Sequence, residues 1–480
     1  MSKKSSVRSS YSTRTTKLTT LQSKHSQSAL EYMMTYGWAI LIIVIVAAVL
    51  YSFGILSPSS SVSVTATGFA GFNVETNCVA GGTLVMSLNN GIGYLIDLHN
   101  ATIHLSNGSS LSEPMDYYLA PGDSHTFFFQ NACPNITGAY YNDRISINGT
   151  ESNALNSLYI ISGSVSGHVG ALVPYQVLEV IKTEGFPTAN AISPNGYYVW
   201  QPDQANGTLS VVNVVSASII NTLSGLPSRS VVFSKNGSQA FVAGNSFNMP
   251  NSINYLVSIN TSNYKVIGNM SGVCDPQILS LSTDTGILLV PPWYPFKHCG
   301  LLAINSSKFS IIDNASMDGF LAWSAVESPN GKYIYLTDSP NDTVSIMNAS
   351  TYKIIKNISG FVSPDSVVFS LDSQYAYIGN GKYLTTINTS SMQIISNITV
   401  TPVNGVSGLT ISSNGKYIYA SICGENVIPV ISTSTEKTIY NITLSGYPSN
   451  ACMSYASLDL SNNLLYIASA SLNLLFVISV

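Results

Sequence analysis

The chain has 480 residues, more than one ordinary domain core holds, so its length predicts roughly two or three domains. Charged residues make up only 9% and the formal net charge is -4, which excludes an electrostatic basis for nucleic-acid binding. Hydrophobic residues make up 45%, which excludes a disordered acidic chain, and Ser, Thr, Asn and Tyr supply most of the polarity.

The N-terminal stretch separates into a basic leader and an apolar run. Residues 1–26 contain six basic residues and no acid, and residues 27–57 contain Glu31 as their single charged residue. At a rise of about 1.5 Å per residue, roughly 20 apolar residues cross a bilayer core of about 30 Å. The alternatives are a buried core helix or a secretory signal, although a secretory apolar region has only about 7–15 residues. We therefore expect a helix over 27–57 in a membrane or a filament core, with the basic leader cytoplasmic and the rest outside.

The residues before the apolar run carry a more specific signal. They read KHSQSALEYMM from Lys24 and resemble the class III signal peptide of archaeal type IV pilins and archaellins. The resemblance implies cleavage between Ser26 and Gln27, and pairing of Glu31 with the terminal amine of a neighbouring subunit, which would offset the cost of burying its charge. The family has Gly or Ala where this chain has Ser26, and Lys or Arg where it has His25. The alternative is a plain membrane anchor in which Glu31 is an interfacial acid.

Residues 58–168 have the pattern of a small β-sandwich. Short runs of alternating apolar and polar residues are separated by turns of Gly, Asn, Pro and Ser, as in half-buried strands. A segment of roughly 100 residues in such runs has the usual size of a sandwich. Cys78 and Cys133 are its two cysteines, and we expect them to pair. The runs include Ser61–Thr67, Thr83–Leu88, Ala101–Leu105, Ser124–Phe129 and Arg144–Ile147.

From Gly185 onward the chain repeats a unit at intervals of 41 to 48 residues. One unit, Ser324–Gly360, contains four short strands, and the turn of its first hairpin recurs in every unit. Asn-Gly is the strongest signal for a tight hairpin, and four strands in about 40–50 residues is the size of a propeller blade. The units resemble YVTN-type propeller repeats. The recurring turns fall at Asn195-Gly196, Asn236-Gly237, Asp284, Asn330-Gly331, Asp372, Asn414-Gly415 and Asn462.

Seven units predict a seven-bladed β-propeller over residues 174–480. The last unit ends at Leu474–Val480, its third strand, and lacks a fourth. A separate strand at Gln176–Thr183 precedes the first unit and resembles the fourth strands of the others. We predict that it completes the last blade, because a closed ring has no open sheet edge between its first and last blades. The fold class is therefore mainly β, with an apolar N-terminal helix, a sandwich and a propeller.

The topology of a propeller assigns the remaining cysteines to one face. Links between blades and turns between second and third strands share a face, which we call the link face, and the other turns lie on the opposite face. Two pairs of cysteines fall on the link face, and the members of each pair are near neighbours: Cys274 with Cys299, and Cys423 with Cys452. We predict disulfides within each pair, which suits an oxidising exterior. Free thiols remain an alternative, whereas no pair has the CxxC spacing of a structural zinc site.

Sixteen Asn-X-Ser/Thr sequons follow the apolar run. Only Asn206 and Asn341 of the propeller sequons fall on the link face. Asn, Ser and Thr are also common turn residues, so part of this pattern is turn chemistry. An outward location makes N-glycosylation plausible at the others. The candidates are Asn260, Asn305, Asn348 and Asn388 at third-to-fourth turns, and Asn269, Asn357, Asn397 and Asn441 in fourth strands, where Asn314 also lies.

Exposed aromatic residues on rigid loops suit contacts with sugars or proteins. The link-face insertion Pro291–Cys299 offers such a set, and the alternative is a loop that folds back onto its own blade. Ser282–Gly286 matches half of a sialidase-type Asp box, but it falls on the ordinary hairpin turn and we assign it to the turn. The candidate binding residues are Trp293, Tyr294, Phe296, Lys297 and His298. The acids that could approach the central channel are Asp203, Asp275, Glu327, Asp338, Asp365 and Glu425.

These observations predict a cell-surface protein rather than an enzyme. It would be anchored in the membrane or built into a filament with pilin-like subunits, and its glycosylated propeller would bind surface glycans or proteins. No catalytic residues, metal ligands or cofactor are predicted. The alternative is a membrane-anchored extracellular propeller enzyme of the hydrolase or lactonase kind, for which a cluster of carboxylates or a metal in the channel would be the sign.

Overall fold

The computed structural model describes residues 64–480 except for 80, 153–156, 171–174, 245–254, 283, 294–298, 317–320, 403–404 and 460–463. Every regular element within these residues is a β-strand, and none of them forms a helix long and apolar enough to cross a membrane. The expected leader and helix, with Ser26, Gln27 and Glu31, lie outside the described residues. Residues 64–480 form one compact unit.

The first eight strands form the predicted sandwich. A five-stranded sheet has the order β1-β8-β7-β4-β5, and a three-stranded sheet has the order β2-β3-β6. Alternate residues of β3 and β7 are buried, so the two sheets pack a shared core that includes Phe127 and Tyr141. The predicted disulfide Cys78–Cys133 ties β2 to the segment after β6. The strands are β1 (Thr65–Thr67), β2 (Phe72–Val79), β3 (Thr83–Asn90), β4 (Ile96–His104), β5 (Ser110–Leu119), β6 (Ser124–Phe129), β7 (Tyr140–Glu151) and β8 (Leu158–His168).

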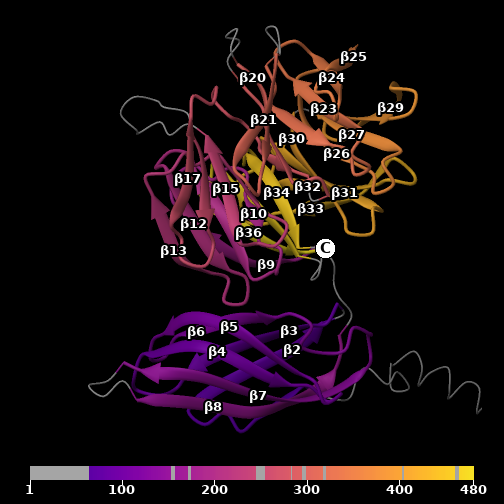
Figure 1. The fold of residues 1–480 in the computed structure, drawn as a ribbon. Helices are drawn as coiled ribbons and strands as arrows, with labels where there is room; N and C mark the ends of the chain where they lie inside the picture. The colour runs from indigo at the N-terminus through magenta and orange to yellow at the C-terminus, as the bar shows by residue number, and fades with distance from the viewer. Residues whose placement is uncertain are drawn as a thin grey trace, which may run out of the picture. The chain divides into compact units, whose positions relative to one another are not determined.

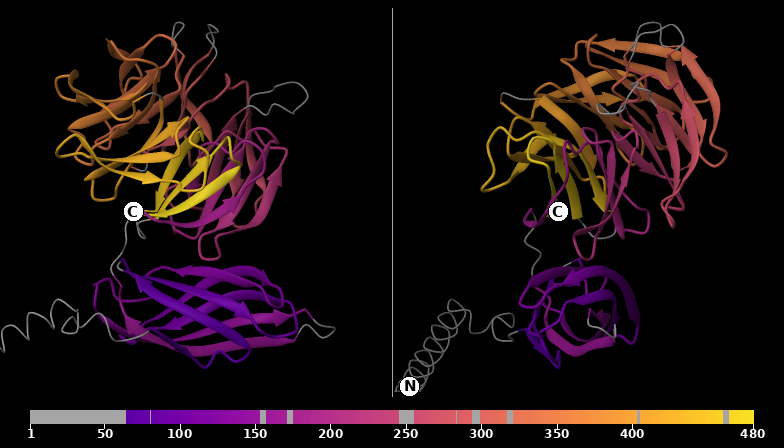
Figure 2. Two further views of the ribbon diagram at one scale, coloured as in Figure 1. Left: turned by 180° about the vertical axis from the view of Figure 1, so that it is seen from behind. Right: turned by 90° about the vertical axis from the view of Figure 1, so that its left-hand side faces the viewer.

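The rest of the described chain forms seven four-stranded antiparallel sheets in sequence order, the blades of a β-propeller (Figure 1). We number them blades 1 to 7. Blade 7 contains three C-terminal strands and borrows β9 (Val177–Lys182), which pairs with β36 (Leu474–Ser479). The predicted closure of the ring is therefore confirmed, and the yellow C-terminal strands lie against the start of the repeat region in both views of Figure 2.

The blade strands have the following bounds. Blades 1 to 3 are β10 (Ala191–Ile192), β11 (Tyr198–Asp203), β12 (Thr208–Asn213) and β13 (Ser218–Ser224); β14 (Ser230–Phe233), β15 (Gln239–Gly244), β16 (Tyr255–Asn260) and β17 (Val266–Ser271); β18 (Ser280–Leu281), β19 (Ile287–Val290), β20 (Gly300–Asn305) and β21 (Ser310–Ser316). Blades 4 and 5 are β22 (Ser324–Glu327), β23 (Tyr333–Asp338), β24 (Thr343–Asn348) and β25 (Ile354–Ser359); β26 (Pro364–Phe369), β27 (Tyr375–Asn380), β28 (Tyr383–Asn388) and β29 (Gln393–Thr399). Blades 6 and 7 are β30 (Gly405–Ile411), β31 (Tyr417–Cys423), β32 (Val427–Ser432) and β33 (Lys437–Thr443); β34 (Met453–Asp459), β35 (Leu464–Ser469), then β36 and β9.

The hairpin turn that marks each repeat has a clear chemical basis. In blade 4 the Ser328 hydroxyl donates to Asn330 Oδ1 at 2.8 Å, and the Tyr333 amide donates to Ser328 Oγ at 3.1 Å. Gly331 follows with φ +68°, a left-handed conformation that glycine adopts without steric cost. In blade 5 Ser373 takes the same place with φ +61°. The turn therefore depends on its Ser-x-Asn/Asp hydrogen bond as much as on glycine.

Burial within a blade changes from the inside outwards. The second and third strands are buried almost throughout, because neighbouring blades cover both of their faces, and polar residues such as Thr337 and Ser345 are buried among their apolar side chains. The fourth strands lie at the rim and alternate between exposed and half-buried residues.

The sandwich packs on blades 1 and 7. The Phe128 amide donates to the Val215 carbonyl at 2.8 Å, and the Phe128 side chain shares one apolar cluster with Leu178 of β9 and Ile219 of β13. The start of the fourth strand in these two blades is therefore covered by the sandwich.

Candidate ligand-binding site at the link face

Two disulfides fix the link face. Cys274 pairs with Cys299 and Cys423 with Cys452, as predicted from the propeller topology. Cys274 lies in the link into blade 3, and Cys299 lies directly before β20 of the same blade. Cys423 is the last residue of β31 in blade 6, and Cys452 lies in the link into blade 7. The links into blades 3 and 7 are therefore attached covalently to the adjacent strands or turns of this face.

A cavity of about 250 Å³ opens at the centre of the link face. All seven blades line it, each with a residue in its first strand or within two residues before it. Phe186, in the link into blade 1, stands at its rim with 46% of its surface exposed. The lining therefore surrounds the mouth of the central channel. The seven residues are Ala189, Arg229, Ile278, Trp323, Asp365, Ser407 and Tyr455.

Trp323 is the centre of an aromatic and cationic stack in this mouth. Its ring packs edge-on against Trp293, with 4.9 Å between centroids, and the Arg229 guanidinium carbon lies 5.0 Å from the Trp323 ring centroid. That distance is within the range of a cation–π contact. Burial raises the pKa of the Tyr455 hydroxyl, and the neighbouring Trp323 indole, whose N–H can only donate, opposes that rise. The Tyr455 hydroxyl in turn donates to the Asp365 backbone carbonyl at 2.7 Å.

Two of the six acids considered above reach this region. Burial raises the pKa of the Asp275 carboxyl, and the charge of Arg229 opposes the rise. Burial likewise lowers the pKa of the Arg229 guanidinium, and Asp275 opposes that change. Among the described residues, Asp275 Oδ1 is a buried acceptor without a hydrogen-bond partner. Burial also raises the pKa of Asp365 to about 6, against the effect of a hydrogen bond from Ser339.

The other four acids have structural roles. Asp203 and Asp338, at the ends of second strands, accept the backbone amides of Phe186 at 2.9 Å and Leu321 at 3.2 Å, and so hold the links to blades 1 and 4. Glu327 lies at the opposite face, where it accepts the Thr285 hydroxyl at 3.1 Å. Glu425 accepts the hydroxyl of Thr401.

The predicted binding loop is described only in part. Trp293 packs on Trp323 as stated above, and its amide donates to the Cys274 carbonyl at 3.1 Å. Tyr294, Phe296, Lys297 and His298 lie outside the described residues, so their role stays a prediction. Sequence reasoning did not identify Phe186, Arg229, Trp323 or Tyr455. The available signal was that a large cationic residue, Arg229, and a large aromatic one, Trp323, stand immediately before the first strands of blades 2 and 4.

The half Asp box behaves as an ordinary turn. Asp284 is exposed between β18 and β19 and lies 4.0 Å from the Lys235 ammonium, which is equally exposed. Within the described part of the chain, no three His, Cys, Asp or Glu side chains come together as metal ligands would.

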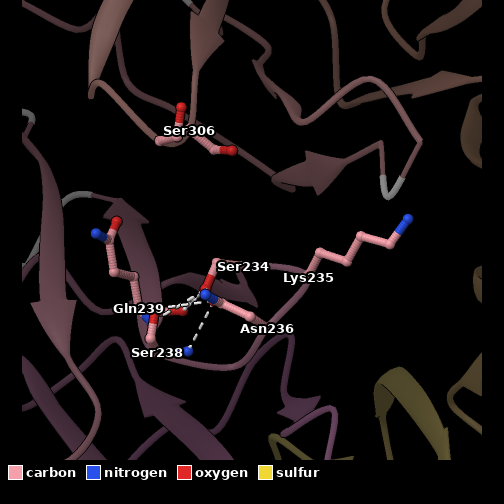
Figure 3. Close-up of a pocket in the computed structure, with 7 residues that line it drawn as sticks. Ser234, Lys235, Asn236, Ser238, Gln239 and Ser306 are labelled. Carbon is pink, nitrogen blue, oxygen red and sulfur yellow. Dashed lines mark hydrogen bonds between the residues drawn. The ribbon is translucent and has the colours of Figure 1, made fainter.

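The opposite face has hollows of another kind. One of about 400 Å³ is lined by Ser, Asn, Gln and Lys from the β14–β15 turn and by Ser306 and Ser307 (Figure 3). The polar groups of its turn bond to one another: Asn236 Oδ1 accepts the hydroxyls of Ser234 at 2.9 Å and Ser238 at 2.8 Å. Because this hollow consists of self-satisfied turn residues, we favour the link-face cavity as the ligand site.

No family model and no curated protein match the chain. Among solved structures, the chain is similar to the β-propeller domain of Myceliophteria thermophila Cps50 (Swd1), with a TM-score of 0.51 and 11% sequence identity. The match covers 64% of this chain and 99% of that chain. As many as 1341 chains of solved structures match, so the likeness shows a common fold and does not identify a ligand.

Proposed function

We propose that this chain is a cell-surface protein that binds proteins or glycans at the link-face mouth of its propeller. Residues 27–57 would hold it in the membrane or in a pilin-like filament, with the sandwich and the propeller outside the cell. The β-propeller fold is compatible with a binding domain, and the seven-blade lining of the mouth is the observation that carries the proposal.

The chemistry of the mouth fits a ligand with an apolar face and polar edges. Trp323 and Phe186 offer aromatic surface, while Arg229 and Asp365 offer a donor and an acceptor beside it. A volume of about 250 Å³ is smaller than the roughly 300–1,000 Å³ of sites for drug-sized molecules. The mouth therefore suits a single sugar unit or one protruding side chain of a partner.

Binding can be tested with the full-length chain in detergent on a glycan array and on immobilised surface proteins of its own cells. Phe186→Ala should weaken retention by about tenfold or more, as truncation of an exposed aromatic anchor does. The matched control is Leu371→Ala, which removes an exposed apolar side chain at the opposite face and should bind normally. Equal binding by both variants would move the site elsewhere, and no retention by the wild type would overturn the proposed function.

Anchoring can be tested by mass spectrometry of the N-terminus of protein from native membranes and surface filaments. A mature start at Gln27 would support pilin-type processing. An intact basic leader would reduce residues 27–57 to a simple anchor and remove the assembly role proposed for Glu31.

A further inference from the structure

The outermost strands of five blades carry an asparagine at one register position. Each faces the third residue of its blade's third strand, and a serine or threonine two residues later faces the first. Both members of each pair are exposed, and the residue between them is buried or half-buried. We call these the collar asparagines: Asn269, Asn314, Asn357, Asn397 and Asn441.

Strand structure does not explain this recurrence. Asparagine is among the residues that strands disfavour, yet it recurs at the same place in blades 2 to 6. Hydrogen bonds to the third strand orient two of the collar asparagines. Asn357 Oδ1 accepts the Ser345 hydroxyl at 2.6 Å, and Asn397 Oδ1 accepts the Thr385 hydroxyl at 3.0 Å. These bonds use Oδ1 and not Nδ2, the atom to which an N-linked glycan attaches.

The sequons in turns are different, because local structure accounts for them. In each, the asparagine Oδ1 accepts hydrogen bonds from the residues two and three positions later in the chain, as in an Asx turn. Asn236 in Figure 3 shows the same arrangement. The four predicted turn sequons of this kind are Asn260, Asn305, Asn348 and Asn388.

Blades 1 and 7 lack the collar asparagine. The same register position holds Thr222, opposite Ser210, in blade 1 and Val180, opposite Phe476, in blade 7. These are the two blades whose fourth strands begin under the sandwich. The collar sequons are thus confined to the part of the rim that the sandwich leaves open.

The open rim also has exposed strand edges and exposed apolar side chains. Fourth strands have an unpaired edge, which can pair with another chain unless charge, proline or bulk prevents it. In blades 2 to 6 the strand has two consecutive exposed apolar residues before its collar asparagine, whereas Ile219 and Leu178 at the covered rim are half-buried. A chain with 9% charged residues has little charge for this purpose. The exposed pairs are Val266-Ile267, Ile311-Ile312, Ile354-Ile355, Ile394-Ile395 and Ile439-Tyr440.

We propose that the collar asparagines carry N-linked glycans, which form a carbohydrate collar over the rim of blades 2 to 6. In the modification, Nδ2 bonds to the anomeric carbon of a glycosyl phosphate donor. The bond from that carbon to the phosphate oxygen breaks, the phosphate leaves with the electron pair, and Nδ2 loses one proton. The inference rests on the proposed outward location, since the donor and its transferase act on exported chains.

The test compares acceptor variants of the full chain expressed in its own cells. Ser359→Ala removes the acceptor hydroxyl for Asn357 but keeps the Asn357–Ser345 bond, so the protein should lose the mass of one glycan. Ser359→Thr should retain that mass. Ser350→Ala, the matched change at the turn sequon of Asn348 in the same blade, should leave the glycan on the Asn357 peptide unchanged. Glycopeptide mass spectrometry of the wild type should find the five collar sites occupied at least as fully as the turn sites.

The outcomes separate this inference from the proposed function. Amine labelling of intact cells with a membrane-impermeant reagent should reach the exposed Lys235. Labelled protein with bare collar sites, or with glycans mainly at the turn sites, would overturn the collar and leave the surface location standing. Unlabelled protein without glycans would overturn both.

Discussion

Asp365→Asn tests whether ionisation of the Asp365 carboxyl at the link-face mouth lowers the stability of the folded protein. Burial raises the pKa of this carboxyl from 3.8 to about 6 in the folded protein, so the folded state holds the proton more tightly than the unfolded chain. The resulting stabilisation is complete below the unfolded pKa of about 3.9 and is lost as pH rises through about 6. A shift of about two units corresponds to roughly 3 kcal/mol at most.

The variant should therefore match the wild type near pH 4 and exceed it near pH 7. The expected gain of up to about 3 kcal/mol corresponds to a Tm increase on the order of 5 °C in a protein of this size. Thermal unfolding followed by tryptophan fluorescence from pH 4 to 7.5 measures the difference. Asp372→Asn is the control in the same blade, since hydrogen bonds from Ser370 and Gln374 lower the pKa of that exposed carboxyl. A gain for Asp365→Asn that does not vary with pH, or a loss at pH 7, would refute the reasoning.

Two further predictions concern the closure and bracing of the ring. Replacing Cys423 and Cys452 by serine opens a bridge across 29 residues and should lower the free energy of unfolding by about 3–4 kcal/mol in urea titrations; an unchanged midpoint would show that the link is fixed by other contacts. Ile181→Ala, in the buried face of the closing strand β9, should cost about 2–4 kcal/mol in the same assay. Ile355→Ala, at an exposed fourth-strand position, should stay within about 0.5 kcal/mol, so equal losses would contradict the role of β9.

The propeller was predictable from sequence because its information is local. Blades 1, 2, 4, 5 and 6 repeat a Ser-x-Asn/Asp turn whose hydrogen bonds are made within five residues. The missing last strand and the spare strand at Gln176–Thr183 then required a closed ring. The link-face disulfides followed as well, since topology alone decides which turns share a face.

The mouth of the channel was less predictable, because its residues come from all seven blades. Arg229, Trp323 and Tyr455 are far apart in sequence and meet only through ring geometry. In addition, the first strands of blades 5, 6 and 7 contain register irregularities near Asp365, Ser407 and Tyr455. A bulge changes which side chain faces the axis, so aligned repeats do not reveal the lining.

The acidic residues also show why the lining of the mouth was hard to predict. Asp203 and Asp338 occupy equivalent places in blades 1 and 4, and each accepts an amide of the incoming link. Asn380 does so in blade 5, where it accepts the Val362 amide at 3.1 Å. A recurrent acid thus indicated a structural role, whereas Asp275 and Asp365, which do not recur, reached the mouth.

The two link-face sequons connect the proposed collar with the proposed binding site. Asn206 Nδ2 donates to Asp203 Oδ2 at 3.4 Å, and Asn341 Nδ2 donates to Asp338 Oδ2 at 2.7 Å. The nitrogen that would accept a glycan is therefore tied to the same carboxylates that hold the links, whereas the oriented collar asparagines Asn357 and Asn397 are bonded through Oδ1. A glycan at either link-face position would project beside the mouth, and one at the rim would not. The hydrogen bonding of these asparagines thus favours a bare binding face within a covered rim.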